Sequence, residues 1–103
     1  MDIQGKAALV TGGGSGLGEA TARELARLGA KVAVLDVNLD NAQRVAADIG
    51  AEFGNGCAVA VQCDVTSPDS VQAALEAAAA AHGPARILMQ IAGIGTAKRV
   101  VGK

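Results

Sequence analysis

Four short, mainly apolar segments that are predicted to be strands occur along the chain, at residues 7–10, 31–36, 57–62 and 86–91. The first is apolar at every position, which is typical of a parallel strand covered on both faces. Between the runs, apolar residues recur with helical spacing over residues 19–28, 39–49 and 67–82. Strands that alternate with helices through short loops predict a parallel sheet with right-handed crossovers. We therefore expect an α/β chain of the order βαβαβαβ.

Capping residues and glycines set the predicted ends of the helices. Asn38 or Asp40 is expected to cap the second helix, which should stop at Gly50. The third has a strong start at Ser67, a capping hydroxyl followed by proline, and its predicted end is His82. The first helix is predicted to bury one stripe, made of Leu17, Thr21, Leu25 and Leu28 and flanked by Ala22 and Ala26. Its charged residues are placed on the solvated side: Glu19, Arg23, Glu24 and Arg27.

The segment 11–18 has the sequence Thr-Gly-Gly-Gly-Ser-Gly-Leu-Gly and joins the first apolar run to the first helix. A strand, a glycine turn and a helix start are the context that a dinucleotide-binding loop requires. Glycine lets the backbone approach a ligand, and the helix N-terminus offers free N–H groups and a positive dipole end to a diphosphate. A P-loop is excluded, because Glu19 follows Gly18 where that loop needs a lysine. We therefore expect Gly12, Gly16 and Gly18 to shape a dinucleotide site.

Asp36 ends the second apolar run, 18 positions after Gly18. The carboxylate that binds the adenosine ribose of a dinucleotide is expected about 20 positions after the glycines. Such a carboxylate accepts hydrogen bonds from both ribose hydroxyls of NAD. It would repel the 2′-phosphate of NADP by up to about 4 kcal/mol at a separation of about 4 Å. We therefore expect a preference for NAD(H).

Further candidates lie where the predicted strands end. Gly12, Asp36, Asp64 and Gly93 each fall at the carboxyl end of a strand. We expect a Rossmann-like, doubly wound parallel sheet with the strand order 3-2-1-4, incomplete in this chain. Ligands bind such sheets outside the carboxyl ends of the strands, at the switch point beside the first strand. Four separate segments should therefore meet at one crevice.

The pattern Thr-Gly-x-x-x-Gly-x-Gly at residues 11–18 resembles the glycine motif of the short-chain dehydrogenase/reductase family. The resemblance continues through three further segments: Leu35-Asp36, Cys63-Asp64-Val65 and Ala92-Gly93-Ile94. It covers essentially the whole chain but only the first part of the family's usual domain. It implies an NAD-dependent enzyme that interconverts a secondary alcohol and a ketone. Residues 5–36 and 63–66 look most like type 2 3-hydroxyacyl-CoA dehydrogenases, so a 3-hydroxyacyl-CoA or a hydroxysteroid is the expected kind of substrate.

The resemblance assigns further cofactor contacts: Ser15 and Leu17 at the diphosphate, Asp64 and Val65 along the adenine, and Ile91, Ala92 and Gly93 beside the adenosine ribose. An ionised Asp64 has no donor, so its role at the adenine would be to accept from the amino group. The alternative is that Asp64 caps the turn that follows it. Both interpretations of Asp64 stay open at this point.

The chain departs from the family's pattern in two places. It has Gln90-Ile91-Ala92-Gly93 where the family usually has Asn-Asn-Ala-Gly, so the geometry of that loop is expected to differ. The family's serine and its Tyr-x-x-x-Lys pair lie later in the domain, and this chain contains no tyrosine. We therefore assign no catalytic residue and interpret residues 1–103 as the N-terminal, dinucleotide-binding part of a longer domain. Alone, it should bind cofactor without turnover, and the full-length parent should act on a small molecule as a dimer or tetramer.

Composition limits the other possibilities. The 103 residues carry a net charge of −1 and a single aromatic side chain, which argues against nucleic acid. No apolar run is long enough to cross a membrane, and the N-terminus shows no secretory pattern. Cys57 and Cys63 form neither a Cys-x-x-Cys nor a zinc pattern, so we expect no metal, buried thiols and a cytoplasmic location.

Two other functions remain as alternatives. A non-catalytic NAD-binding module would use the same crevice without turnover. An S-adenosylmethionine-dependent transferase domain also has a glycine turn and an acidic end on its second strand. Thr11 stands immediately before the first glycine, where such transferases tend to carry an acidic residue upstream, and this disfavours the transferase.

Overall fold

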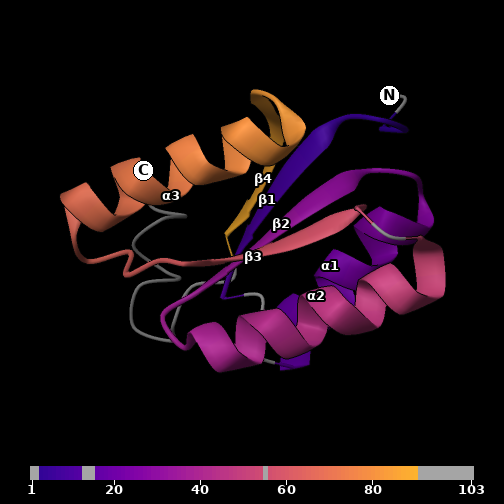
Figure 1. The fold of residues 1–103 in the computed structure, drawn as a ribbon, viewed down its shortest axis with the longest axis horizontal. Helices are drawn as coiled ribbons and strands as arrows, with labels where there is room; N and C mark the ends of the chain where they lie inside the picture. Colours follow the sequence, from indigo (N-terminus) through magenta and orange to yellow (C-terminus); the bar gives the residue numbers. More distant parts are fainter. Residues whose placement is uncertain (1–2, 13–15, 55, 91–103) are drawn as a thin grey trace.

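The computed structural model describes residues 3–12, 16–54 and 56–90. Strands and helices alternate along this part of the chain (Figure 1). Their bounds are β1 Ala7–Thr11, α1 Gly16–Arg27, β2 Lys31–Asp36, α2 Leu39–Phe53, β3 Ala58–Gln62, α3 Pro68–His82 and β4 Ala85–Gln90. The alternation confirms the predicted order βαβαβαβ. Among the described residues, no helix combines the length and the apolar character needed to cross a lipid bilayer.

The strands form one parallel sheet in the order β3-β2-β1-β4, as predicted. β1 lies between β2 and β4, so the strand order reverses beside β1, the place where such sheets bind ligands. Figure 1 shows α1 and α2 on one side of the sheet and α3 on the other. The fold is therefore the doubly wound, Rossmann-like α/β arrangement.

Two apolar clusters lie on opposite faces of the sheet, because successive strand residues point to opposite sides. The larger cluster lies against α1 and α2, and its bulkiest members are Val10, Val32, Val34, Val45 and Ile49. The smaller lies against α3 and consists of Leu9, Ala33, Leu35, Cys63, Ala74 and Ala78. The third helix contributes only alanines to its buried cluster, and its Leu75 is left exposed.

The buried face of α1 differs from the predicted stripe. Gly18, Ala22 and Ala26 are buried, whereas Leu17 is 69% exposed and Leu28 is 45% exposed. Residues four positions apart share one face of a helix. Small side chains on that face let the helix backbone lie close to the sheet. The predicted stripe was therefore wrong by one position. Ala22 and Ala26, which were predicted to flank the buried stripe, lie at its centre.

The end of α2 also differs from its prediction. The helix passes through Gly50 and continues to Phe53, and Gly54 ends it with φ 124° and an N–H donated to the Gly50 carbonyl at 2.9 Å. A glycine inside a helix costs only about 1 kcal/mol relative to alanine. Here the apolar stripe continues past it, since Phe53 packs against the same cluster as Ile49. Packing therefore carries the helix through the glycine.

The helices α2 and α3 are each capped by a residue that the sequence marks as a cap. Asn38 caps α2 and accepts a hydrogen bond from the Asn41 N–H at 3.2 Å. Ser67 caps α3 and accepts from the Ser70 N–H at 3.3 Å. Since these helices begin directly after β2 and β3, their N-termini lie at the carboxyl edge of the sheet. Positive helix ends thus gather where the crevice was predicted.

The cysteines lie at opposite ends of β3 and both are free thiols. Cys57 is half-buried, with its Sγ 3.9 Å from the Ile49 carbonyl oxygen. Cys63 is buried under α3, and this burial, together with the charge of Asp64, raises the pKa of its thiol. The prediction of a buried thiol is therefore confirmed for Cys63, whereas Cys57 is only partly buried.

Candidate dinucleotide-binding site

Three predicted site segments meet at the carboxyl edge of the sheet. Thr11 at the end of β1 pairs in register with Leu35, and Asp36 pairs with Gln62 at the end of β3. Cys63 then donates its N–H to the Asp36 carbonyl at 3.0 Å. The starts of the glycine turn, of the β2–α2 connection and of the β3–α3 connection therefore lie side by side. The fourth segment, with Ile91, Ala92 and Gly93, lies outside the described residues.

The passage from β1 to α1 provides the anion-binding part of this edge. Gly12 follows β1 with φ 70°, a left-handed conformation that glycine adopts without strain. α1 begins at Gly16, where a Cβ would meet no atom within 4 Å, so the helix N-terminus is open on that side. Its first-turn N–H groups have no acceptor within the helix. Gly18 is buried against the sheet and Leu17 is exposed beside it, while Ser15 lies outside the described residues.

Asp36 is held in place by its own turn. Its Oδ1 accepts a hydrogen bond from the Asn38 N–H at 2.9 Å, which fixes the carboxylate at the end of β2. A carboxylate has about four lone-pair sites and can accept several hydrogen bonds at once, including bonds from ribose hydroxyls. The hollow next to this turn is lined by Val37, Asn38, Leu39, Asp40 and Gln62, a set with a second acid and no base. Its chemistry fits hydroxyl donors and does not fit a phosphate.

Asp64 caps the turn after β3. Its Oδ1 accepts from the Thr66 N–H at 2.9 Å and from the Thr66 hydroxyl at 2.6 Å, and its own N–H donates to Ser70 Oγ at 2.9 Å. The bonds from the Thr66 hydroxyl and then its N–H lower the pKa of the Asp64 carboxyl. The capping alternative is therefore observed, and an adenine contact stays a prediction. Val65 is half exposed at the same corner.

Replacing Thr66 by valine should raise the pKa of Asp64 toward its ordinary value of about 3.9, because the hydroxyl donor is lost while the N–H remains. With a depressed native pKa, the carboxylate stabilises the fold above the unfolded pKa. This contribution is lost as pH falls through the native one. Carboxyl NMR titration of the wild type and Thr66→Val checks the shift. Identical midpoints in the two proteins would contradict the assigned bonds.

His82 lies at the other end of the molecule from these residues. It is the last residue of α3, and its Nε2 is 3.2 Å from the Gly56 carbonyl, next to the start of β3. His82 thus lies at the negative end of the α3 dipole, at the helix end that the sequence predicts. Within residues 3–12, 16–54 and 56–90, no group of three or more His, Cys, Asp or Glu side chains is arranged to hold a metal ion.

Comparison with known proteins identifies the family of this chain. A model of the short chain dehydrogenase family matches residues 6–101. This chain belongs to that family. Its relatives include the uncharacterized oxidoreductase YuxG of Bacillus subtilis, 44% identical over 91 residues that make up 88% of this chain and 13% of that protein. D-threitol dehydrogenase of Mycolicibacterium smegmatis is 44% identical over 92 residues, which is 89% of this chain and 35% of the relative.

Solved structures of family members agree in fold. The 3-ketoacyl-(acyl-carrier-protein) reductase from Brucella melitensis, complexed with NADH, has a TM-score of 0.76 and 43% identity over 84% of this chain and 34% of its own. A short chain dehydrogenase/reductase from Burkholderia phymatum in complex with NAD has a TM-score of 0.79 and 34% identity over 85% of this chain and 31% of its own. The chain thus spans about a third of these structures.

Proposed function

We propose that this chain is the NAD(H)-binding part of a short-chain dehydrogenase that interconverts a secondary alcohol and a ketone. The observation that carries the proposal is the register of β1 and β2: Thr11, at the end of the strand that leads toward α1, pairs with Leu35, directly before Asp36. The helix end suits a diphosphate, and the acid suits a ribose. Bound nicotinamide would supply the hydride chemistry, and the residues of this chain would bind and orient the cofactor.

Within this proposal the cofactor is NAD(H) rather than NADP(H). Asp36 gives the expected ribose region an acid, and a 2′-phosphate beside it would be repelled. The Brucella and Burkholderia proteins were solved with NADH and NAD. The cofactor contacts assigned by resemblance complete the proposed site, including Ser15, Val65 and the 91–93 loop.

The substrate is proposed only as a class. Relatives are named for secondary alcohols or their ketones, such as sorbitol-6-phosphate 2-dehydrogenase of Erwinia amylovora and a hydroxysteroid dehydrogenase of Escherichia coli. A 3-hydroxyacyl-CoA or a hydroxysteroid is the specific proposal for this protein. The parent is proposed to be a cytoplasmic dimer or tetramer.

We also propose that residues 1–103 are the first part of a longer domain. On the α3 side of the sheet, Leu75 and Leu88 are exposed and, with Val65, line an apolar cavity of about 310 Å³. The Thr11 hydroxyl at this cavity is buried and has no hydrogen-bond partner among the described residues. Parallel sheets are normally covered on both faces. A further segment packed here would cover this face, and the remaining chain would bring the Tyr-x-x-x-Lys pair.

Calorimetric titration of this chain with NAD, NADP and S-adenosylmethionine tests the function. The proposal predicts binding of NAD, at least about tenfold weaker binding of NADP, and no binding of S-adenosylmethionine. Binding of S-adenosylmethionine alone would establish the transferase alternative. NAD binding without turnover in the longest native product would establish the non-catalytic module.

A further inference from the structure

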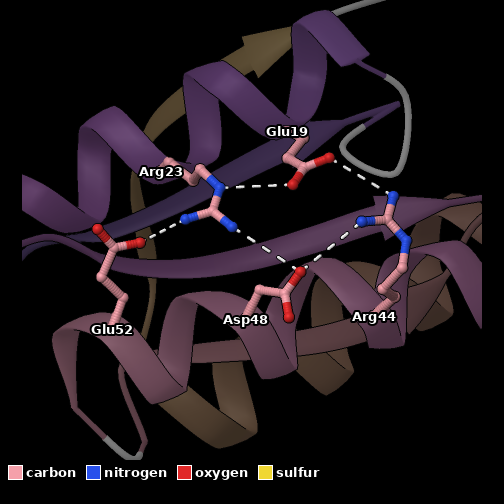
Figure 2. Close-up of polar contacts among 5 residues, drawn as sticks. All are labelled: Glu19, Arg23, Arg44, Asp48 and Glu52. Carbon is pink, nitrogen blue, oxygen red and sulfur yellow. Dashed lines mark hydrogen bonds and ion pairs between the residues drawn. The ribbon is translucent and has the colours of Figure 1, made fainter.

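Charged side chains connect α1 to α2 in a continuous network (Figure 2). Arg23 of α1 pairs with Glu19 on its own helix and reaches Asp48 and Glu52 on α2. Arg44 of α2 pairs with Glu19 at 3.5 Å and with Asp48 at 3.7 Å. Each oxygen of Glu19 therefore has its own arginine: Oε2 contacts Arg23 and Oε1 contacts Arg44. The sequence placed Glu19 and Arg23 simply on a solvated face.

Glu19 is the least exposed acid of this network, and it lies near the N-terminus of α1. Its side chain is 21% exposed, against 48% for Asp48 and 55% for Glu52. It stands in the first turn of α1, three residues after the helix start at Gly16. At a rise of 1.5 Å per residue, this is about 4.5 Å along the helix axis. That separation is shorter than the screening length of about 8 Å at physiological salt.

A carboxylate at this position opposes the proposed ligand. The open end of α1 would receive a diphosphate, which is itself an anion. Glu19 is tolerable there only if its charge is offset by nearby cations. Arg23 is shared with both Asp48 and Glu52, whereas Arg44 is shared with Asp48 alone. Arg44 therefore supplies the second positive charge.

We propose that Arg44 is a positioning residue for dinucleotide binding that acts through Glu19, by holding and neutralising the carboxylate beside the diphosphate end of α1. The inference rests on the proposed NAD(H) function. It assigns a role to a side chain of α2 outside the glycine turn and the strand-end acids. In this proposal the ion-pair network both joins α1 to α2 and favours binding of the dinucleotide.

The chain offers a matched control in a second ion pair of α1. Arg27 pairs with Glu24 on exposed surface, in the last turn of the helix. The Arg27→Gln substitution removes the same charge and the same type of contact as Arg44→Gln, but at the end of α1 away from the glycine turn. A general effect of net charge or helix stability would therefore appear in both variants.

Calorimetry with NAD and with adenosine, on this chain at low and high salt, tests the role. Arg44→Gln should weaken NAD binding about three- to tenfold, which is the size of effect expected when one charge near a helix terminus is changed. Arg27→Gln should leave NAD binding unchanged, and Arg44→Lys should restore most of the loss. Adenosine, which has no diphosphate, should bind equally to all variants. The loss should shrink at high salt.

The double variant Glu19→Gln with Arg44→Gln distinguishes two roles of Arg44: neutralising the Glu19 carboxylate, and only holding α1 and α2 together. Removing both charges should return NAD affinity to near the wild-type value. A double variant that binds as weakly as Arg44→Gln, or more weakly, would overturn the inference, as would equal losses in Arg44→Gln and Arg27→Gln. If the wild type binds NAD and Arg44→Gln does not alter it, only this inference fails. If the wild type binds no dinucleotide, the proposed function fails with it.

Discussion

Replacing Asp36 by alanine should weaken NAD binding by about 10- to 100-fold, because hydrogen bonds to a charged acceptor contribute about 1.5–3 kcal/mol. The substitution also removes the acceptor of the Asn38 N–H, so the turn after β2 loses its internal bond. Asp36→Asn keeps an oxygen for that turn and removes the charge. We therefore expect Asp36→Asn to raise NADP affinity relative to NAD affinity. Titration of each variant with both dinucleotides measures the effect.

Asp40→Asn is the control for this substitution. Asp40 lines the hollow next to the Asp36 turn, is the second residue of α2, and carries the same charge as Asp36. Its loss should change NAD affinity by no more than about twofold, as for exposed charges generally. Equal effects of Asp36→Asn and Asp40→Asn would mean that general electrostatics, and not a ribose contact, sets the preference.

The second large effect concerns stability. Ile49 on α2 is fully buried and belongs to the group of bulkiest core side chains. Replacing it by alanine should lower the free energy of unfolding by about 2–5 kcal/mol, from lost apolar burial and the cavity left behind. That is a large fraction of the roughly 5–15 kcal/mol typical of a domain. Urea unfolding followed by circular dichroism measures the change.

Two further variants serve as controls for this prediction: a smaller change at the same core position, and a change at a more exposed leucine. Ile49→Val removes one methylene group and should cost about 0.5–1.5 kcal/mol, so it remains measurable if the alanine variant does not fold. Leu28→Ala, at the exposed end of α1, should cost less than Ile49→Ala because Leu28 is 45% exposed. A cost at Leu28 equal to that at Ile49 would contradict the assigned core.

The fold was predictable because its signals are local. The glycine turn, Asp36 and the caps Asn38 and Ser67 all occupy strand-to-helix connections, where turn chemistry and capping act within a few residues. The strand order 3-2-1-4 followed from the doubly wound fold that the alternation of strands and helices predicts. The family resemblance rested on the same connections, and the family match over residues 6–101 confirms it.

Features that depend on packing were harder to predict. The buried face of α1 was misplaced because Ala22 and Ala26 are small, and their burial follows from how closely the helix approaches the sheet. The end of α2 was misplaced because packing of Phe53 outweighs the glycine at 50. The same holds for the contact of Glu19 with Arg44, which joins residues 25 positions apart.

Some site features were missed although the sequence carries a signal for them. Asp36 and Asp64 each accept a hydrogen bond from the N–H two residues further on, from Asn38 and from Thr66. Aspartate commonly forms such a turn after a strand. Both acids are thus oriented by their own backbone before any ligand binds. The sequence raised this possibility only for Asp64.

The central claim is that an adenine dinucleotide lies across the carboxyl ends of the strands. Two-dimensional amide NMR of the labelled chain during titration with NAD tests it most directly. The largest shifts should fall on Gly12, Gly16 to Gly18, Asp36 and the Asp64–Val65 turn. Shifts concentrated instead at the opposite edge, around Gly29, Gly56 and His82, or no shifts at saturating NAD, would contradict the account.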